Sequence, residues 1–268
     1  MNIFSSTIKN VYVFLFARKA FYKINLLLYK LSMTGIGIHN YENDHVSGEK
    51  AFIKYMIAKN GFREGVILDV GANVGHYAIM LRKNNITLPI FAFEPHPVAF
   101  KKLEQAASLH QFIPVKRGAG EVSTTAVIYD YAGNTGSEHA SMYKAVISDL
   151  RNSAVEEVNI DLVTIDHFVA ENNISKVALL KIDTEGHELN VLKGAGLTIA
   201  KGMVDVIQIE FNEMNVISRT FFRDIIDILP GYDFYRLLPD GLLPLGAYKI
   251  LDFEIFAFQN IVAIKQGR

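Results

Sequence analysis

The 268-residue chain contains no cysteine. It therefore has no disulfide framework, no thiol nucleophile and no cysteine metal site. The absence of cysteine suits a reducing compartment, and we expect the protein to be cytoplasmic. Half of the residues are apolar and 21% are charged, which is ordinary for a globular α/β protein.

Acidic side chains are absent from the first 41 residues. This segment holds five of the 27 Lys and Arg residues, so it carries a charge of +5 and the remainder carries −6. An acidic main body argues against nucleic acid as a partner. We expect residues 1–45 to be a helical extension and residues 46–268 to be one domain, long enough to bury a large core.

Long uncharged runs are also missing from residues 1–31, although aliphatic and aromatic side chains are abundant there. The run before Arg18 is too short to cross a bilayer, and no cleavable flank of a secretory signal accompanies it. We predict an amphipathic helix that packs on its own domain, forms a homodimer with a partner subunit, or lies on the inner face of the membrane. Its basic stripe comprises Lys9, Lys19, Lys23 and Lys30.

Residues 66–81 predict a strand, a glycine turn and a helix. The apolar run Val66–Leu68 is typical of a buried parallel strand, and Asp69 closes it. Gly71 and Gly75 allow the chain to turn sharply before a helical pattern begins. Such a unit is the first half of a nucleotide-binding crossover, whose ligand lies outside the carboxyl end of the strand.

The spacing of these glycines indicates which ligand the turn suits. Gly-x-x-x-Gly is not the Gly-x-Gly-x-x-Gly of dinucleotide sites, which disfavours a nicotinamide-dependent oxidoreductase. Asp69 suits a cationic group better than a pyrophosphate. S-adenosylmethionine carries an ammonium and a sulfonium and no phosphate, so it fits the turn. The plainer alternative is that Asp69 only caps the helix.

A second acid follows the next predicted strand. The apolar run Ile90–Phe93 ends at Glu94 and Pro95, about twenty residues after the first turn. An acid at this place can accept hydrogen bonds from both ribose hydroxyls of an adenosine. The alternative is a solvated strand end without a ligand.

Three motifs together resemble one protein family. Val-Ile-Leu-Asp-Val-Gly-Ala-Asn-Val-Gly at 66–75, Phe-Glu-Pro at 93–95 and Leu-Leu-Lys-Ile-Asp-Thr-Glu-Gly-His-Glu at 179–188 occur in this order. The chain resembles the FkbM-type S-adenosylmethionine-dependent methyltransferases from about Ser47 to Phe211. The resemblance implies an α/β, Rossmann-like doubly wound sheet that is mostly parallel, with an antiparallel strand near the C-terminus.

The resemblance also implies where S-adenosylmethionine binds. Glu49, at the start of a predicted helix, is a candidate for the ammonium of the methionine end, although a first-turn acid is an equal alternative. Ala119 follows the third strand, where such folds hold the adenine. The other predicted contacts are Asp69, Gly71, Ala72, Asn73, Gly75, Glu94, Pro95 and Asp183.

Methyl transfer needs an aligned acceptor and, for a hydroxyl, a base that takes its proton. Asp183, Glu185 and His187 follow the fourth strand and are our candidate catalytic residues. His187 is predicted to be the base or an acceptor ligand; an unperturbed imidazole loses this ability below pH 6–7. The plainer alternatives are that Asp183 binds turn amides and that His187 only packs.

A metal site is less favoured. Asp183, Glu185 and Glu210 close neighbouring strands, and their oxygens suit magnesium. The sequence has no compact metal-binding spacing, so we predict none.

The sequence after the fourth predicted strand indicates which atom of the substrate accepts the methyl group. Amine-methylating relatives often have Asn/Asp-Pro-Pro-Tyr/Phe after the fourth strand, whereas this chain has Asp-Thr-Glu-Gly at 183–186. By analogy with the family, we expect methylation of a hydroxyl oxygen, most simply on a sugar of a glycan or of its nucleotide- or lipid-linked precursor. A non-sugar small molecule and a non-catalytic binding protein are the alternatives. Residues 130–155 are expected to be the acceptor-binding part.

The rest of the chain is predicted from periodicity and turn residues. A Pro/Gly-rich loop at 239–246 joins the two strands expected to close the sheet. Helices are expected at 97–109 and 221–229, and strands at 112–116, 127–129, 158–163, 177–182, 204–209, 234–238 and 253–264.

Overall fold

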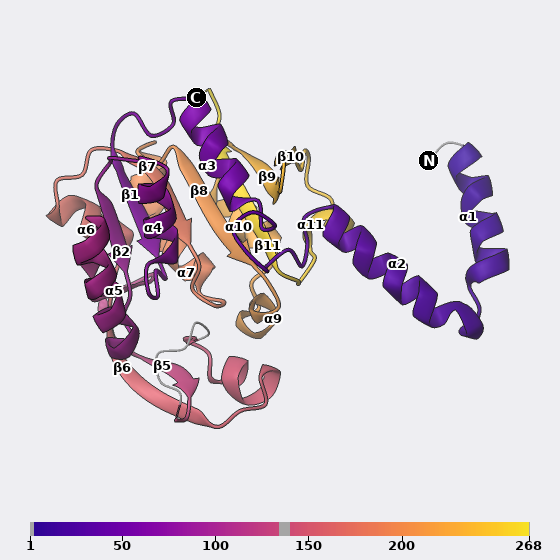
Figure 1. The fold of residues 1–268 in the computed structure, drawn as a ribbon, viewed down its shortest axis with the longest axis horizontal. Coiled ribbons are helices and arrows are strands. Elements are labelled where there is room, and N and C mark those ends of the chain that lie inside the picture. The colour runs from indigo at the N-terminus through magenta and orange to yellow at the C-terminus, as the bar shows by residue number, and fades with distance from the viewer. Residues whose placement is uncertain (1–2, 134–139, 268) are drawn as a thin grey trace.

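The computed structural model describes residues 3–133 and 140–267. Figure 1 shows an α/β body from which the first two helices, α1 (Ile3–Phe16) and α2 (Tyr22–Gly35), project. Within the described residues, no helix is both long and apolar enough to cross a membrane.

An eight-stranded sheet forms the centre of the body, in the order β10-β9-β11-β8-β7-β1-β2-β3. The five strands from β8 to β3 run parallel, and β11 joins them antiparallel to β8. This confirms the predicted Rossmann-like fold. The strands are β1 (Val66–Val70), β2 (Ile90–Phe93), β3 (Ile113–Val115), β7 (Val177–Ile182), β8 (Val206–Phe211), β9 (Tyr232–Leu238), β10 (Gly241–Pro244) and β11 (Gln259–Lys265).

Helices cover both faces of this sheet, so its central strands are buried on both sides. All six residues of β7 are buried, as its near-continuous apolar run predicts. Two separate core clusters result. On one face pack α3 (Glu49–Ala58), α4 (His76–Lys83) and α5 (Pro97–His110); on the other pack α6 (Ile165–Glu171), α7 (Glu188–Lys193), α8 (Gly196–Ala200) and α10 (Phe222–Ile228).

A second, three-stranded sheet lies beyond the carboxyl ends of β1 and β2 (Figure 1). It consists of β4 (Gly118–Ala119), β6 (Val155–Val163) and β5 (Thr124–Tyr131), with β5 and β6 antiparallel. The predicted strands at 127–129 and 158–163 thus lie within β5 and β6. Part of the expected acceptor loop, 134–139, lies outside the described residues; the rest includes a π-helical turn at Val146–Leu150.

Two expectations near the C-terminus were wrong. The predicted loop at 239–246 contains β10, which pairs antiparallel with β9. Gly241 pairs with Leu238, so Pro239 and Asp240 form a two-residue hairpin turn, and the Pro and Gly residues of this stretch were taken for a longer loop. The predicted strand from residue 253 begins only at Gln259, because residues 250–253 form the short helix α11 (Ile250–Phe253).

The N-terminal segment is not one continuous helix, contrary to expectation. Arg18 has an extended backbone (φ −129°, ψ 149°), and a short 3-10 turn at Lys19–Phe21 separates α1 from α2. The predicted stripe of four lysines along one helix is therefore wrong. Lys23 and Lys30, seven residues apart, still share one face of α2.

Candidate active site

A pocket opens at the carboxyl ends of the parallel strands, where open α/β sheets bind their ligands. Its walls come from the turns after β1, β2 and β7 and from the second sheet. It is lined by Val70, Gly71, Asn73, Glu94, Pro95, Gly118, Ala119, Ile128, Ala140, Met142, Ile160, Leu162, Asp183, Thr184, Glu185 and His187.

A wider hollow lies at the opposite edge of the sheet, near the amino ends of β1 and β7, and it is lined mainly by charged and polar side chains. Its Lys176 is already paired with Glu64 at 2.8 Å and with Asp205 at 3.1 Å. Because ligands of parallel sheets bind at the carboxyl ends, the first pocket is the candidate active site.

The turn after β1 is held tightly against its neighbours. Backbone N–H groups of Gly71 and Ala72 donate to the carbonyl of Phe93, at 3.1 and 2.9 Å. Gly71, Asn73 and Gly75 all have positive φ, at 84°, 47° and 90°. A Cβ on Gly71 would lie 1.7 Å from the carbonyl oxygen of Asp183, so only glycine lets this turn approach the end of β7.

Replacing Gly71 with Ala should lower the free energy of unfolding by about 2–4 kcal/mol, from left-handed strain and the backbone clash together. Urea denaturation would measure the loss. Gly231→Ala is the control, because Gly231 has a similar φ of 83° and nothing within 4 Å of the added Cβ. That variant should lose only about 1–2 kcal/mol. Equal losses in both variants would contradict the close approach to Asp183.

Glu94 is buried and joins two of these turns. One carboxylate oxygen accepts the N–H of His96 at 2.7 Å, and the other accepts the N–H of Asn73 at 2.9 Å. A carboxylate has about four acceptor positions, so two remain for further donors. Burial raises the pKa of Glu94 to about 7, against these two hydrogen bonds, which favour the charged form.

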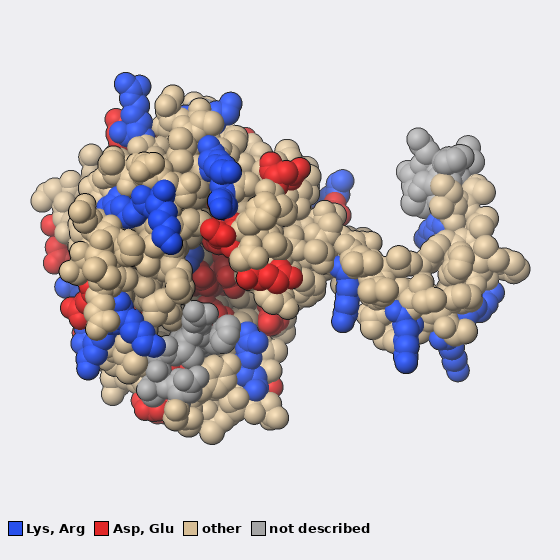
Figure 2. Space-filling model, viewed as in Figure 1, with Lys and Arg blue, Asp and Glu red and all other residues tan. Residues whose placement is uncertain are grey.

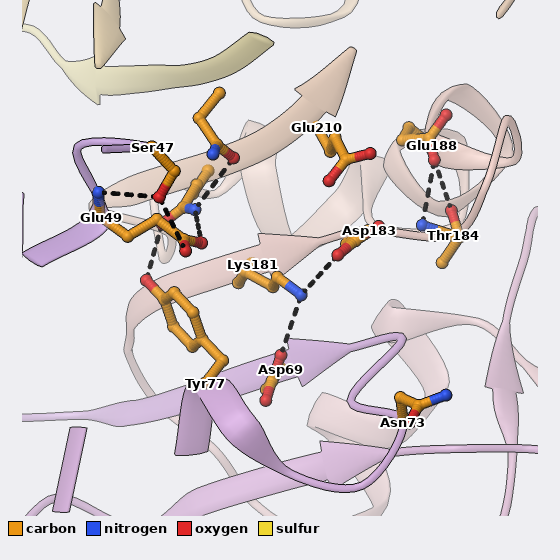
Figure 3. A network of polar contacts seen from close by, with 12 residues as sticks. Ser47, Glu49, Asp69, Asn73, Tyr77, Lys181, Asp183, Thr184, Glu188 and Glu210 are labelled. Carbon is orange, nitrogen blue, oxygen red and sulfur yellow. Dashed lines mark hydrogen bonds and ion pairs between the residues drawn. The ribbon is translucent and has the colours of Figure 1, made fainter. Parts of the chain in front are cut away.

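A buried ion network lies beside the pocket, centred on Lys181 (Figure 3). Its ammonium is 3.0 Å from Asp183 and 3.7 Å from Asp69, and it sits over the Tyr77 ring at 5.4 Å. Burial opposes this charge, yet Asp183, Asp69 and Glu49 together raise the pKa of Lys181 above its ordinary value. Lys181 is thus the cation that allows several carboxylates to stay charged in a desolvated place.

Glu49 belongs to this network and does not line the pocket. Its carboxylate accepts from the Gln208 amide at 2.9 Å and from the Ser47 hydroxyl at 3.2 Å. The hydroxyl of Tyr77 donates to the other end of the Gln208 amide at 2.6 Å. Burial raises the pKa values of Glu49 and Asp69, and Lys181 opposes that rise in both.

The turn after β7 brings the three candidate catalytic residues to one pocket. The strand stops at Ile182, and the chain then turns through Glu185 and Gly186, whose φ values are 52° and 101°. A positive φ is uncommon outside glycine, and such strain often occurs at functional sites. The three side chains thus come from a turn and not from the strand, and Asp183, Glu185 and His187 all line the pocket.

Glu188, a first-turn acid of α7, holds this turn in place. One of its oxygens accepts from the N–H of Thr184 and from the N–H of Gly186, both at 3.0 Å. The other accepts from the Asn215 amide at 3.1 Å. With both oxygens engaged in a fully buried site, Glu188 shapes the turn and is not a pocket residue.

His187 is half-buried in the pocket wall. Its Nδ1 lies 3.0 Å from the amide of Asn190, and its ring is 6.1 Å from that of Tyr143. Burial lowers the pKa of His187 to about 4, with Glu121 opposing weakly. The imidazole is therefore neutral at pH 7, the form that can accept a proton, and the expected loss of this form at pH 6–7 moves to about pH 4.

Glu210 projects from β8 towards Asp183 (Figure 3). Burial raises its pKa well above the ordinary value, and Asp183 and Glu185 add to the rise; the Asn212 amide donates to it at 2.7 Å. Among the described residues, no group of three or more His, Asp or Glu side chains is arranged to hold a metal ion.

These motifs agree with a protein-family model. The model for the FkbM methyltransferase domain matches residues 69–235, which span the first turn, Glu94, the turn after β7 and most of the sheet. The chain belongs to the FkbM methyltransferase family.

Curated relatives in this family are moderately similar. The chain is 27% identical to methyltransferase 1 of Beauveria bassiana over 49% of its own length and 58% of that protein. It is 29% identical to hexuronic acid methyltransferase AglP of Haloferax volcanii, over 62% and 63%. It is 28% identical to 31-O-demethyl-FK506 methyltransferase FkbM of Streptomyces tacrolimicus, over 48% and 58%. The matches thus span about three-fifths of each relative.

Solved structures show more distant likenesses. Methyltransferase FkbM from Methylobacillus flagellatus is 16% identical with a TM-score of 0.45, over 75% of this chain and 43% of that one. The O-methyltransferase from Bacillus cereus in complex with SAH is 12% identical with a TM-score of 0.42, over 97% of both chains.

The site of this FkbM-family chain contains most of the predicted residues. Those that line the pocket are Gly71, Asn73, Glu94, Pro95, Ala119, Asp183, Glu185 and His187. Glu49 and Asp69 lie in the ion network beside it, and Ala72 and Gly75 shape the turn. A Cβ on Gly75 would press on Leu103 and Phe112 at 2.9 Å, so this glycine serves packing against α5.

Sequence reasoning missed two groups of site residues. The first is Lys181, whose charge inside an otherwise apolar strand is a signal that could have been used, since buried lysines are rare without partners. The second is the apolar wall from the second sheet. Ile128, Ile160 and Leu162 carry no motif, and only the fold brings them to the pocket.

Proposed function

We propose that this FkbM-family protein transfers a methyl group from S-adenosylmethionine to a hydroxyl oxygen of a sugar, in a glycan or in its nucleotide- or lipid-linked precursor. One observation carries the proposal: Glu94, with free acceptor positions, shares a pocket with Asp183, Glu185 and His187. An adenosine-type acid and a candidate base thus stand at one site.

The residues present fit S-adenosylmethionine. Glu94 can accept the ribose hydroxyls, and Ile128, Ile160 and Leu162 offer apolar surface to an adenine. The carboxylate of Asp183, which lines the pocket, suits the cationic methionine end. Asp69 is fully buried beside the pocket, where the ammonium of Lys181 lies 3.7 Å from it, and it acts on the site through this ion pair. When bound, S-adenosylmethionine supplies an electrophilic methyl group on a sulfonium.

The chain's own residues would act on the acceptor. Displacement forms a bond from the acceptor oxygen to the methyl carbon and breaks the bond from that carbon to sulfur; the hydroxyl proton goes to neutral His187. The hydroxyl of Ser141, which follows β5 and pairs with Tyr129 of that strand, donates to the carbonyl of Glu185 at 2.7 Å. This contact closes the second sheet over the turn after β7, which helps to position an acceptor and exclude water.

The name of one relative supports a sugar acceptor, and the name of another supports an oxygen acceptor. AglP is named a hexuronic acid methyltransferase, and the Streptomyces relative is named for methylating the 31-oxygen of a demethyl-FK506. The second name keeps a non-sugar small molecule as the other candidate. Transfer of labelled methyl to the carbohydrate fraction of the protein's own organism would separate the two, and its absence from all fractions would favour a non-catalytic binding protein.

Cofactor binding can be tested at Glu94. Glu94→Gln should weaken binding of S-adenosylmethionine and S-adenosylhomocysteine about ten- to a hundredfold, because hydrogen bonds to a charged acceptor contribute about 1.5–3 kcal/mol. Gln keeps the shape of the side chain and one of its two acceptor oxygens, so it can still accept from one of the two turns, whereas Ala would accept from neither. Isothermal titration calorimetry measures the effect, with Glu104→Gln on the exposed face of α5 as the matched control.

The same titration should depend on pH in the wild-type protein. The ionised carboxylate is the better acceptor, and the pKa of Glu94 is raised to about 7. Affinity should therefore fall as the pH drops below about 7, by up to tenfold per pH unit, and this dependence should vanish in Glu94→Gln. Unchanged affinity in a folded Glu94→Gln protein would remove Glu94 from the cofactor site.

A further inference from the structure

The two projecting helices form an arm, here defined as residues 6–32, that stands away from the body (Figure 1). No residue of the arm is buried. Contact with the body begins only after it, where Met33 and Ile38 pack against Ala257 in a small cluster of their own. The arm is therefore anchored at one end and free along its length.

The bend of the arm is held by its own contacts. Asn25 on α2 accepts a hydrogen bond from the Tyr12 hydroxyl at 2.6 Å and donates to the carbonyl of Phe16 at 2.9 Å. The Phe16 ring also meets the ring of Phe21 edge-on, at 5.4 Å. These contacts give α1 and α2 a fixed arrangement without help from the body.

The surface of the arm is strongly apolar. Fourteen large aliphatic and aromatic side chains between Ile8 and Leu31 are exposed, from 38% to 71%. They occur on every side of both helices, so the body could not cover them all even if the arm folded back. Exposed apolar surface of this extent marks a binding surface for a protein or a membrane.

The charges of the arm decide between these partners. All five charged side chains are basic, and the first 41 residues contain no acid. Figure 2 shows basic side chains projecting along one edge of the arm, beside surface that has no charged side chains. Two such arms packed together would bring like charges close, whereas an anionic lipid surface attracts every one of them. Long basic side chains can also bury their stems in the interface while their charged ends stay in water.

The dimensions of the arm suit a position along a membrane surface. Each helix has 14 residues and is about 21 Å long, whereas a hydrocarbon core is about 30 Å thick. Arg18 and Lys19 lie between the helices. Tyr12, Tyr22 and Tyr29 add amphipathic rings of the kind that concentrate at headgroup level.

We propose that the arm docks the protein on the surface of an anionic phospholipid bilayer, with its apolar side chains at the headgroup boundary and its basic side chains among the headgroups. This inference is independent of the reaction at the pocket.

Co-sedimentation of the full chain with vesicles tests the proposal. Binding is expected to phosphatidylcholine vesicles that contain about one-third phosphatidylglycerol, and much more weakly to phosphatidylcholine alone. The double variant Lys23→Gln/Lys30→Gln should bind the anionic vesicles about thirtyfold less tightly, since each lysine near an anionic leaflet contributes about fivefold. Lys101→Gln/Lys102→Gln, on the exposed face of α5, makes the same charge change on the body and should have no effect.

Removing residues 1–31 should abolish vesicle binding and leave the Met33–Ala257 contact intact. Cofactor titration of the truncated protein shows whether the body still folds. A full chain that ignores anionic vesicles overturns the proposal, and so does equal binding to neutral and anionic vesicles. A dimer that the truncation converts to a monomer, without vesicle binding by the full chain, would instead show that a second copy covers the arm.

Discussion

Lys181→Met should lower the free energy of unfolding by about 3–5 kcal/mol at pH 7.5, because it leaves buried carboxylates without their cation. Lys181 is the ammonium shared by Asp69 and Asp183, and its charge also opposes the rise that burial causes in the pKa of Glu49. Methionine fills a similar volume, so little of the loss should come from a cavity. Urea denaturation followed by circular dichroism measures it.

Lys176→Met is the matched control for this variant. Lys176 also pairs with two acids, Glu64 and Asp205, but its side chain is 34% exposed. An ion pair at the surface contributes about 0–1 kcal/mol, so this control should lose little. If both variants lost a similar free energy of unfolding, burial of Lys181 would not be the reason that its network stabilises the protein.

The difference in free energy of unfolding between wild type and Lys181→Met should become smaller as the pH falls from 7.5 towards 5. Burial holds the pKa values of Asp69 and Glu49 above their ordinary values, and Lys181 opposes the rise. Without Lys181 both values rise further, so the folded variant takes up protons that the unfolded chain binds only at lower pH. Proton uptake by the folded state stabilises it as the pH decreases. A loss that is constant with pH would mean that these carboxylates do not carry the effect.

Much of the fold and pocket could be predicted because the signals are local. The turn after β1 needs glycine where φ is positive, and Gly71 and Gly75 occupy such positions. Glu94 follows a short apolar strand at the expected distance from that turn. The order of these motifs along the chain then fixes which strand ends meet, since consecutive parallel strands place their carboxyl ends at one edge.

The ion network could not be predicted in the same way, because its members come from distant parts of the chain. Glu49 on α3 bonds to Gln208 on β8, which is 159 residues later. Asp69 and Glu49 were expected to face the cofactor directly, whereas they surround Lys181 beside the pocket. Residue types at strand ends indicate charge near a site, but the direction of each side chain depends on packing between strands.

The broken N-terminal helix shows a second limit. Apolar residues occur on all sides of residues 3–35, so periodicity does not mark where one helix ends and the next begins. The interruption at Arg18 is held by Asn25, which bonds to Tyr12 and to the Phe16 carbonyl. A single asparagine in an apolar segment is a weak signal, and its partners 9 and 13 residues away are set by the bend itself.

Replacing His187 with Ala should lower the turnover number about a hundred- to ten-thousandfold at saturating cofactor, if His187 is the base. Cofactor affinity should change little, because this loss belongs to the acceptor step. The acid limb of the wild-type profile should lie near pH 4, since burial lowers the pKa of His187 to about 4. Steady-state kinetics from pH 5 to 8 should therefore show a turnover number that does not change with pH. The Michaelis constant for the cofactor should rise as the pH drops below about 7, where Glu94 becomes protonated. Turnover in His187→Ala close to wild type would show that the ring only packs.

Asn190 provides the sharper test, because it controls which nitrogen of His187 carries the proton. With its amide nitrogen 3.0 Å from Nδ1, Asn190 donates, and the ring proton then lies on Nε2. A base acting through Nε2 needs the opposite tautomer, in which Asn190 presents its oxygen to an Nδ1–H. Asn190→Asp offers only oxygens, so it should hold that tautomer and retain a turnover number within about tenfold of wild type. It should also move the acid limb of the pH profile up from about pH 4, because a carboxylate raises the pKa of a neighbouring histidine. Asn190→Leu has no acceptor and should lose turnover without that movement. An acid limb that stays in place in Asn190→Asp would contradict the role of His187 as the proton acceptor.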